Sequence, residues 1–180
     1  NSGATVGALI SLILMFGWVS GAHFNPVVTI AAKFLDNFSS RDIVPYVIAQ
    51  TIGGCIGTVI ANLMFDLDAI TLSTKIRTGS NIWLSEAVAT IGLLLVIFLI
   101  SRSGRTSAVP FAVGVWIGGA YWFTSSTSLA NPAVTLARSL TDTFAGIAPE
   151  SVPMFVLMQL VGLAIALVII KFIAPQTDSQ

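Results

Sequence analysis

Residues 20–36 of the chain are SGAHFNPVVTIAAKFLD, and residues 126–142 are STSLANPAVTLARSLTD. The two stretches align without a gap, and each contains Asn-Pro followed by Val-Thr two residues later. Asn accepts a hydrogen bond from a first-turn N–H, and Pro is favoured at the next position, where its missing N–H costs nothing. The sequence therefore predicts two short helices at equivalent places, over residues 25–35 and 131–140.

The remaining chain has the composition of a membrane protein. It is 55% hydrophobic and 9% charged, whereas soluble domains carry about 25% charged residues. Eight basic residues balance eight acidic ones, so no net field favours nucleic acid. A span needs roughly 20 apolar residues, and in a bilayer it must be helical. Five segments meet or approach that length: 3–19, 43–65, 82–100, 107–123 and 152–173.

The two Asn-Pro stretches belong to an internal repeat. The spans after them share a pattern at a constant offset, with Gln50, Gly53 and Gly57 matching Gln159, Gly162 and Ala166. An odd number of spans separates the copies, so they enter the membrane oppositely, as in inverted repeats. We expect one membrane domain, with an incomplete first repeat (1–66) and a second repeat (82–173). Because span 82–100 has no counterpart, we expect one more helix before residue 1 in the natural protein.

The basic residues predict how the chain is oriented in the membrane, and the small residues predict where its helices are in close contact. Five basic residues lie at or just after the ends of the first short helix, the third span and the last span: Lys33, Arg41, Arg102, Arg105 and Lys171. If that side is cytoplasmic, residue 1 lies outside and the C-terminus inside. Small residues four apart predict close helix packing at Gly3/Gly7, Gly53/Gly57, Gly114/Gly118 and Gly162/Ala166.

The two short helices define a candidate site. Inserted from opposite sides, they direct the positive ends of their dipoles at one spot near the midplane. Each Asn still has an NH₂ group to offer outward when its oxygen is occupied. The arrangement predicts a pore that donates hydrogen bonds to small neutral solutes and repels cations and protons.

The segments SGAHFNPVVT and ANPAVT resemble the paired Asn-Pro-Ala boxes of the aquaporin (major intrinsic protein) family, here Asn25-Pro26-Val27 and Asn131-Pro132-Ala133. The resemblance covers the chain from the family's second helix onward. It implies an all-α bundle of six helices and two re-entrant half-helices, a homotetramer in the cell membrane with one pore per subunit, and no cofactor. Val27 stands where Ala is usual, and we expect its extra methyl groups to narrow or stiffen the midplane.

The resemblance also places an outer constriction at Thr5, Gly119, Ser128 and Val134. Water-selective members have an aromatic residue, His, a small residue and Arg there, and this chain matches only the small residue. Val134 supplies neither the charge nor the N–H fork of an Arg. We expect a wider, less cationic filter that admits glycerol, urea, ammonia or arsenous acid. A shift of one residue in the first helix would put Val6 or Ala4 in place of Thr5.

Three other groups have alternative interpretations. Glu86 lies in an apolar span, where ionisable groups are functional by default; it is a proton relay or, as the resemblance implies, a brace that accepts from backbone N–H groups of a re-entrant loop. His23 is expected to hold its loop by hydrogen bonding, because a metal site would need further ligands. Arg138 and Asp142 are expected to form a local ion pair.

Two other functional classes stay open. Inverted repeats also build ion-coupled secondary transporters, whose intramembrane acid here would be Glu86. A non-conducting structural protein would follow if Val27 closes the pore. An enzyme is not expected, because the sequence has no nucleophile–base pair, metal-ligand cluster or phosphate-binding loop.

Overall fold

The computed structural model describes residues 1–175, and all regular secondary structure in that range is helical, as the sequence predicts. The α-helices are α1 (Ser2–Ser20), α2 (Pro26–Leu35), α3 (Ser40–Met64), α4 (Ser80–Arg102), α5 (Val109–Phe123), α6 (Pro132–Ala137) and α7 (Val152–Ile173). Three short 3₁₀ helices complete the set: η1 (Thr106–Ala108), η2 (Arg138–Leu140) and η3 (Pro149–Ser151).

Four of the five expected spans are long and apolar enough to cross a membrane: α1, α3, α4, and α7 together with η3. The exception is α5, whose 15 residues fall short of this length. The preceding η1 turn adds three residues, and the two together reach about 28 Å at the usual rise per residue. The span expected over 107–123 is therefore built from two helical pieces, η1 and the shorter α5.

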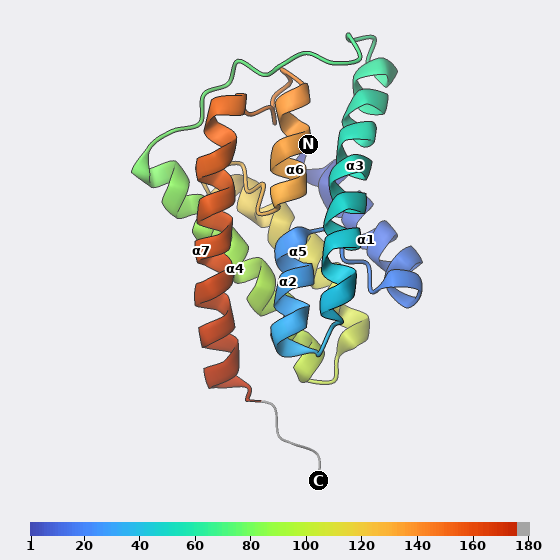
Figure 1. Cartoon of the computed structure of the whole chain (residues 1–180), viewed down its shortest axis with the longest axis vertical. Helices are drawn as coiled ribbons and strands as arrows, with labels where there is room; N and C mark the ends of the chain where they lie inside the picture. The colour runs from blue at the N-terminus through green and yellow to red at the C-terminus, as the bar shows by residue number, and fades with distance from the viewer. Residues whose placement is uncertain (176–180) are drawn as a thin grey trace.

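The two half-helices lie end to end in the middle of the molecule (Figure 1), α2 below and α6 above. Both pack against α3 and α7. Residues 65–79 cross over the top of the molecule from α3 to α4 (Figure 1). This arrangement brings the two Asn-Pro boxes together at mid-height.

Small residues allow close contact at only some of the expected places. A Cβ atom at Gly118 would lie 2.3 Å from Val6 Cγ2, and one at Gly114 would lie 2.7 Å from Ile10, so α1 and α5 need both glycines. A Cβ at Gly162 would lie 2.9 Å from the Ala87 carbonyl oxygen of α4. The expectation is wrong for four other glycines, where an added Cβ atom would meet nothing within 4 Å: Gly3, Gly7, Gly53 and Gly57. In the first repeat, no described helix takes the place that α4 takes beside Gly162.

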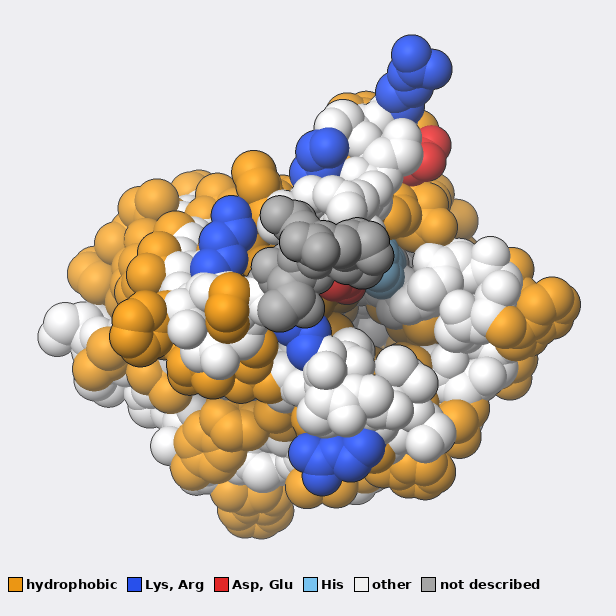
Figure 2. All heavy atoms as spheres, turned by 90° about the horizontal axis from the view of Figure 1, so that it is seen from below, with side chains coloured by type: hydrophobic (Ala, Val, Ile, Leu, Met, Phe, Trp, Pro, Cys, Tyr) orange, Lys and Arg blue, Asp and Glu red, His pale blue; other side chains and the backbone are white. Residues whose placement is uncertain are grey.

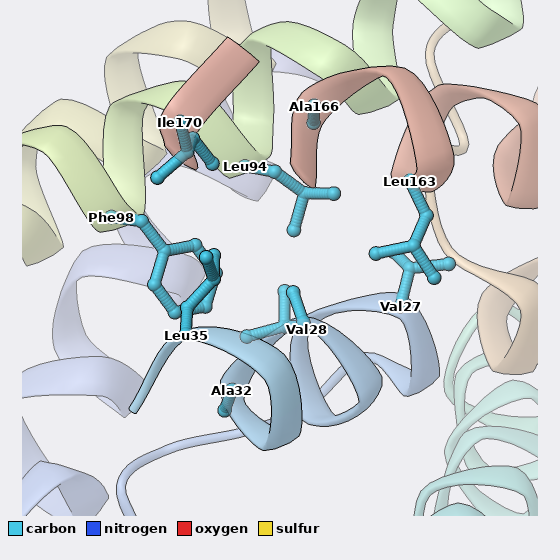
Figure 3. Close-up of a cluster of buried hydrophobic side chains, with 10 residues drawn as sticks. Val27, Val28, Ala32, Leu35, Leu94, Phe98, Leu163, Ala166 and Ile170 are labelled. Carbon is cyan, nitrogen blue, oxygen red and sulfur yellow. The ribbon is translucent and has the colours of Figure 1, made fainter. Parts of the chain in front are cut away.

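A buried apolar cluster joins α2, α4 and α7 (Figure 3). Its larger members include Leu35, Leu94, Phe98 and Ile170, each at most 2% exposed. Val27 is fully buried in this cluster and points from α2 toward α7, near Leu163 (Figure 3). The expectation that Val27 narrows the pore is therefore wrong, because its methyl groups fill the core, while its stiffening of the midplane stays a prediction.

Five of the eight basic residues lie at the lower end of the bundle, where α2, α4 and α7 end and α3 begins: Lys33, Arg41, Arg102, Arg105 and Lys171. Arg102 donates to the carbonyls of Leu35 (3.2 Å) and Ala174, which joins the ends of α2, α4 and α7. The Lys171 ammonium lies 5.9 Å from the centre of the Phe34 ring. Figure 2 shows this end, with Lys and Arg side chains standing among apolar ones. The excess of basic residues that the sequence predicts on one side of the membrane is therefore found at this end of the bundle.

Candidate functional site

Each Asn of the two boxes caps its own half-helix. Asn25 Oδ1 accepts from the backbone N–H of Val27 at 3.1 Å. Asn131 Oδ1 accepts from those of Ala133 (3.0 Å) and Val134 (3.2 Å). Pro26 and Pro132 hold the first helical positions. The local chemistry predicted from the sequence is therefore present in both copies.

The two boxes are also bonded to each other, which the sequence pattern did not indicate. Asn25 Nδ2 donates to the Ala130 carbonyl at 2.8 Å, and Asn131 Nδ2 donates to the Phe24 carbonyl at 2.9 Å. Each Asn thus holds the residue that precedes the other Asn. Since an amide nitrogen carries two hydrogens, one N–H of each Asn remains for the cavity that both side chains line.

Equivalent side chains support the two half-helices from behind. Gln50 Nε2 of α3 donates to Thr29 Oγ1 at 2.9 Å, and Gln159 Nε2 of α7 donates to Thr135 Oγ1 at 2.8 Å. Each Thr hydroxyl in turn donates to its box Asn carbonyl, four residues earlier. The repeat seen in the sequence is thus repeated in the hydrogen bonds.

Glu86 joins α4 to the loop that carries the second box. Its side chain is fully buried, and Oε1 accepts from the Ala130 N–H at 2.5 Å and from Gln159 Nε2 at 2.6 Å. A fully buried acid needs such donors, because an unpaired buried polar group costs about 1–3 kcal/mol. These contacts favour the brace among the two interpretations of Glu86.

The loop held by Glu86 has an uncommon backbone. Thr127, Ser128 and Ala130 have φ values of 64°, 55° and 45°, in the left-handed region that non-glycine residues rarely occupy. Such strain persists where surrounding contacts impose it. Here the Glu86 bond to Ala130 and a bond from the Ser128 N–H to Ser126 Oγ (3.1 Å) supply those contacts.

His23 holds its loop through its backbone and ring. Its carbonyl accepts from Gln50 Nε2, and its ring lies 5.2 Å from that of Phe38 and 5.9 Å from that of Tyr46. The expected hydrogen bonding is therefore made by the main chain, while the imidazole packs against aromatic rings. Within residues 1–175, no group of three or more His, Cys, Asp or Glu side chains could hold a metal ion.

A cavity of about 560 Å³ runs beside the two boxes. Asn25 and Val28 of the first half-helix line it together with Asn131 and Val134 of the second. Much of the remaining wall is apolar and comes from α1, α4 and α5. The cavity therefore offers a few hydrogen-bonding groups along an apolar path, as is usual for small-molecule sites.

Three of the four expected constriction residues line this cavity: Thr5, Ser128 and Val134. Thr5 Oγ1 lies 3.2 Å from the hydroxyl of Tyr121, a wall residue that no sequence motif pointed to. Gly119 is not among the wall residues, and a Cβ there would face the Phe123 ring at 3.5 Å.

The rotation of α1 about its axis determines which of its residues, Thr5, Val6 or Ala4, takes the expected constriction position. Val6 points at Gly118 of α5, since a Cβ on that glycine would collide with its Cγ2 atom. Ala4 is exposed on the outside of the bundle. Of the three candidates, only Thr5 lines the cavity.

The expected ion pair between Arg138 and Asp142 is wrong. Asp142 instead pairs with Lys75 at 3.0 Å and accepts from the backbone N–H and hydroxyl of Thr74, each at 3.0 Å. Asp142 lies beyond the end of η2, so the one-turn spacing assumed for a continuous helix does not hold. The loop between α3 and α4 thereby becomes attached to the segment after the second half-helix.

Comparisons with known proteins agree with this geometry. Residues 2–128 match the family model described as major intrinsic protein. The chain is 47% identical to the aquaglyceroporin AqpS of Rhizobium meliloti (strain 1021), over 96% of this chain and 74% of that protein. It is 31% identical to the probable aquaporin AqpM of Archaeoglobus fulgidus, over 94% of this chain and 74% of that protein.

The fold and the paired boxes define a multi-pass membrane channel rather than an enzyme. The chain belongs to the major intrinsic protein family. This membership favours a passive pore over the ion-coupled transporter that the inverted repeat alone left open.

Proposed function

We propose that the protein is a passive channel for water and small neutral solutes, with glycerol as the reference solute and urea, ammonia and arsenous acid as further candidates. The observation that carries the proposal is the cavity lined by both box asparagines and by the uncharged side chains of Thr5, Ser128 and Val134. The name of its aquaglyceroporin relative supports the same class of solute.

Physical chemistry supports the role of each part. The two half-helix N-termini and the remaining Asn N–H groups favour oxygen acceptors and disfavour cations at the junction. Val134 leaves the constriction without a charge and with less bulk than an Arg. Ser128, which also lines the cavity, is small, so a solute with more than one carbon has room to pass beside Val134.

The alternative of a closed structural protein has less support. It depended on Val27 blocking the midplane, and Val27 is fully buried in the α2–α4–α7 cluster. The cavity wall beside Asn25 contains Val28 instead.

We also propose that the protein works as a homotetramer in the bilayer. The outward face of α3 carries an apolar residue at every fourth position, at least 52% exposed in each case: Val44, Ile48, Ile52, Ile56 and Ile60. Such a stripe suits lipid or a neighbouring subunit. The mass of the particle in detergent or nanodiscs tests this: four copies support the proposal, and a monomer with solute flux contradicts it.

The test of the channel is solute entry into liposomes that contain the full-length protein. Stopped-flow light scattering would follow water, glycerol and arsenous acid gradients for the wild type and for Val134→Arg. We expect rapid glycerol entry in the wild type and its loss, with water flux retained, in Val134→Arg. Water flux alone in the wild type would contradict the wide filter, and the absence of all flux in a folded protein would contradict the channel.

A further inference from the structure

Arg138 follows the second half-helix and faces the cavity. Asn131, Val134 and Arg138 are separated by three and four residues, which places them on one face of the helix. All three line the cavity. At about 1.5 Å per residue, Arg138 lies roughly 6 Å beyond Val134 along the helix axis. Its backbone is anchored, since its carbonyl accepts from the Ile147 N–H at 3.3 Å.

The charge of Arg138 has no acidic partner among the residues that the structure describes. The ion pair found within residues 1–175 is that of Lys75 with Asp142, the acid closest to Arg138 in sequence. Arg138 is half-buried, so its guanidinium is neither paired nor spread over the outer surface. A half-buried charge on an apolar wall acts over a longer distance than one in free solvent.

Arg77, another basic side chain near the second box, holds loops together instead of facing the cavity. Arg77 donates to the carbonyls of Gly146 (2.8 Å), Phe144 (3.1 Å) and Ser126 (3.3 Å). It therefore ties the α3–α4 loop to the segments on either side of the second half-helix, and it does not line the cavity. Along the described wall, charged residues occur at opposite ends: Asp36 beyond the first half-helix and Arg138 beyond the second.

We infer that Arg138 is a specificity-determining residue, which rejects cations at the outer mouth one helical turn beyond the uncharged constriction. This inference rests on the proposed channel function. A wide filter with Val134 passes larger neutral solutes but has no charge of its own against small organic cations. The guanidinium supplies that charge one turn beyond Val134, and its N–H groups can bind the oxygens of an entering neutral solute.

The expected size of the effect follows from Coulomb's law. A unit charge about 10 Å away, at an effective dielectric constant of about 20, changes the local population of a cation on the order of tenfold. The half-helix dipoles at the Asn junction contribute separately. Removing Arg138 should therefore weaken cation exclusion without abolishing it.

The experiment compares the full-length wild type with Arg138→Gln, Arg138→Lys and Arg105→Gln in liposomes. Arg105 is exposed, bonds to Ser103 and does not line the cavity, so it is the matched control. Glycerol entry and methylammonium entry are measured on the same preparations. We expect the methylammonium-to-glycerol permeability ratio to rise about tenfold in Arg138→Gln, and to stay at the wild-type value in the other two variants.

An unchanged ratio in Arg138→Gln, or an equal rise in Arg105→Gln, would overturn the inference while leaving the channel intact. A wild type that passes no glycerol would overturn the proposed function, and this inference with it. A second variant guards against misfolding. Arg138→Cys in a Cys55→Ser background, labelled with a cationic thiol reagent, should exclude methylammonium again, whereas an anionic reagent should not; restoration by both or by neither would contradict the role of the charge.

Discussion

Asn25 and Asn131 bind each other's loops: the side-chain amide of each donates to the carbonyl of the residue that precedes the other, at 2.8 and 2.9 Å. Each amide oxygen simultaneously caps its own half-helix. At the midplane, the two Asn side chains therefore join the two loops by a reciprocal pair of hydrogen bonds. Both the stability of this junction and its remaining N–H donors depend on both asparagines.

Replacing Asn131 by Ala should lower the free energy of unfolding by about 2–4 kcal/mol. The change removes a helix cap, worth about 1 kcal/mol, and leaves the Phe24 carbonyl without its donor, at a further cost of about 1–3 kcal/mol. Thermal or denaturant unfolding in detergent measures the loss. Asn81→Ala, at an exposed position of α4, is the control; equal stability of the two variants would contradict the role of the junction.

Glu86→Gln should keep most of the stability and the glycerol flux, because an amide oxygen can still accept from the Ala130 N–H. Glu86→Ala should lower the free energy of unfolding by about 2–4 kcal/mol, since it leaves the Ala130 N–H without its acceptor and removes one of the two acceptors of Gln159 Nε2. Unfolding and glycerol entry are measured on both variants. Proton-dependent uptake in the wild type that Glu86→Gln removes would instead support the relay.

Val27→Ala should reduce stability by about 1–2 kcal/mol and leave solute permeability unchanged. Two buried methyl groups are lost from the cluster of α2, α4 and α7, and a small cavity remains. Val115→Ala, at a position 66% exposed on α5, should have little effect on either quantity. Faster glycerol entry in Val27→Ala would show that Val27 does face the pore.

Acid should loosen the outer loop through Asp142. Hydrogen bonds from Lys75, and then from Thr74, lower the pKa of Asp142 from 3.8 to about 2. A lowered native pKa means that these contacts stabilise the fold above about pH 4 and are lost as the pH falls toward 2. The effect is modest, because the side chains of Lys75 and Asp142 are 38% and 32% exposed and solvent screens the pair.

Limited proteolysis of residues 66–79 at about pH 6 and about pH 2.5 checks this dependence. Asp142→Asn should be cleaved faster than the wild type at the higher pH and should respond less to acid. The same acid response in both proteins would contradict the assignment to Asp142.

Several parts of this protein follow from local chemistry and could be predicted from the amino-acid sequence. Asn and then Pro are favoured at the start of a helix, and long apolar segments must be helical in a bilayer. The two half-helices, the spans and the basic end of the bundle were predictable for that reason. The isolated acid Glu86 could likewise be recognised as needing an explanation.

The neighbour that each side chain meets depended instead on tertiary packing. The period of a helix defines its faces but not the partner of each face, so the sequence did not show that Val27 lies wholly in the core while Val28, also part of that core, lines the cavity as well. The partner of Asp142 depended on a loop that returns from 67 residues earlier in the chain. Because that loop pairs with Asp142, Arg138 has no acidic partner within residues 1–175. A charge pairs with the group that the fold brings nearest rather than with its neighbour in sequence.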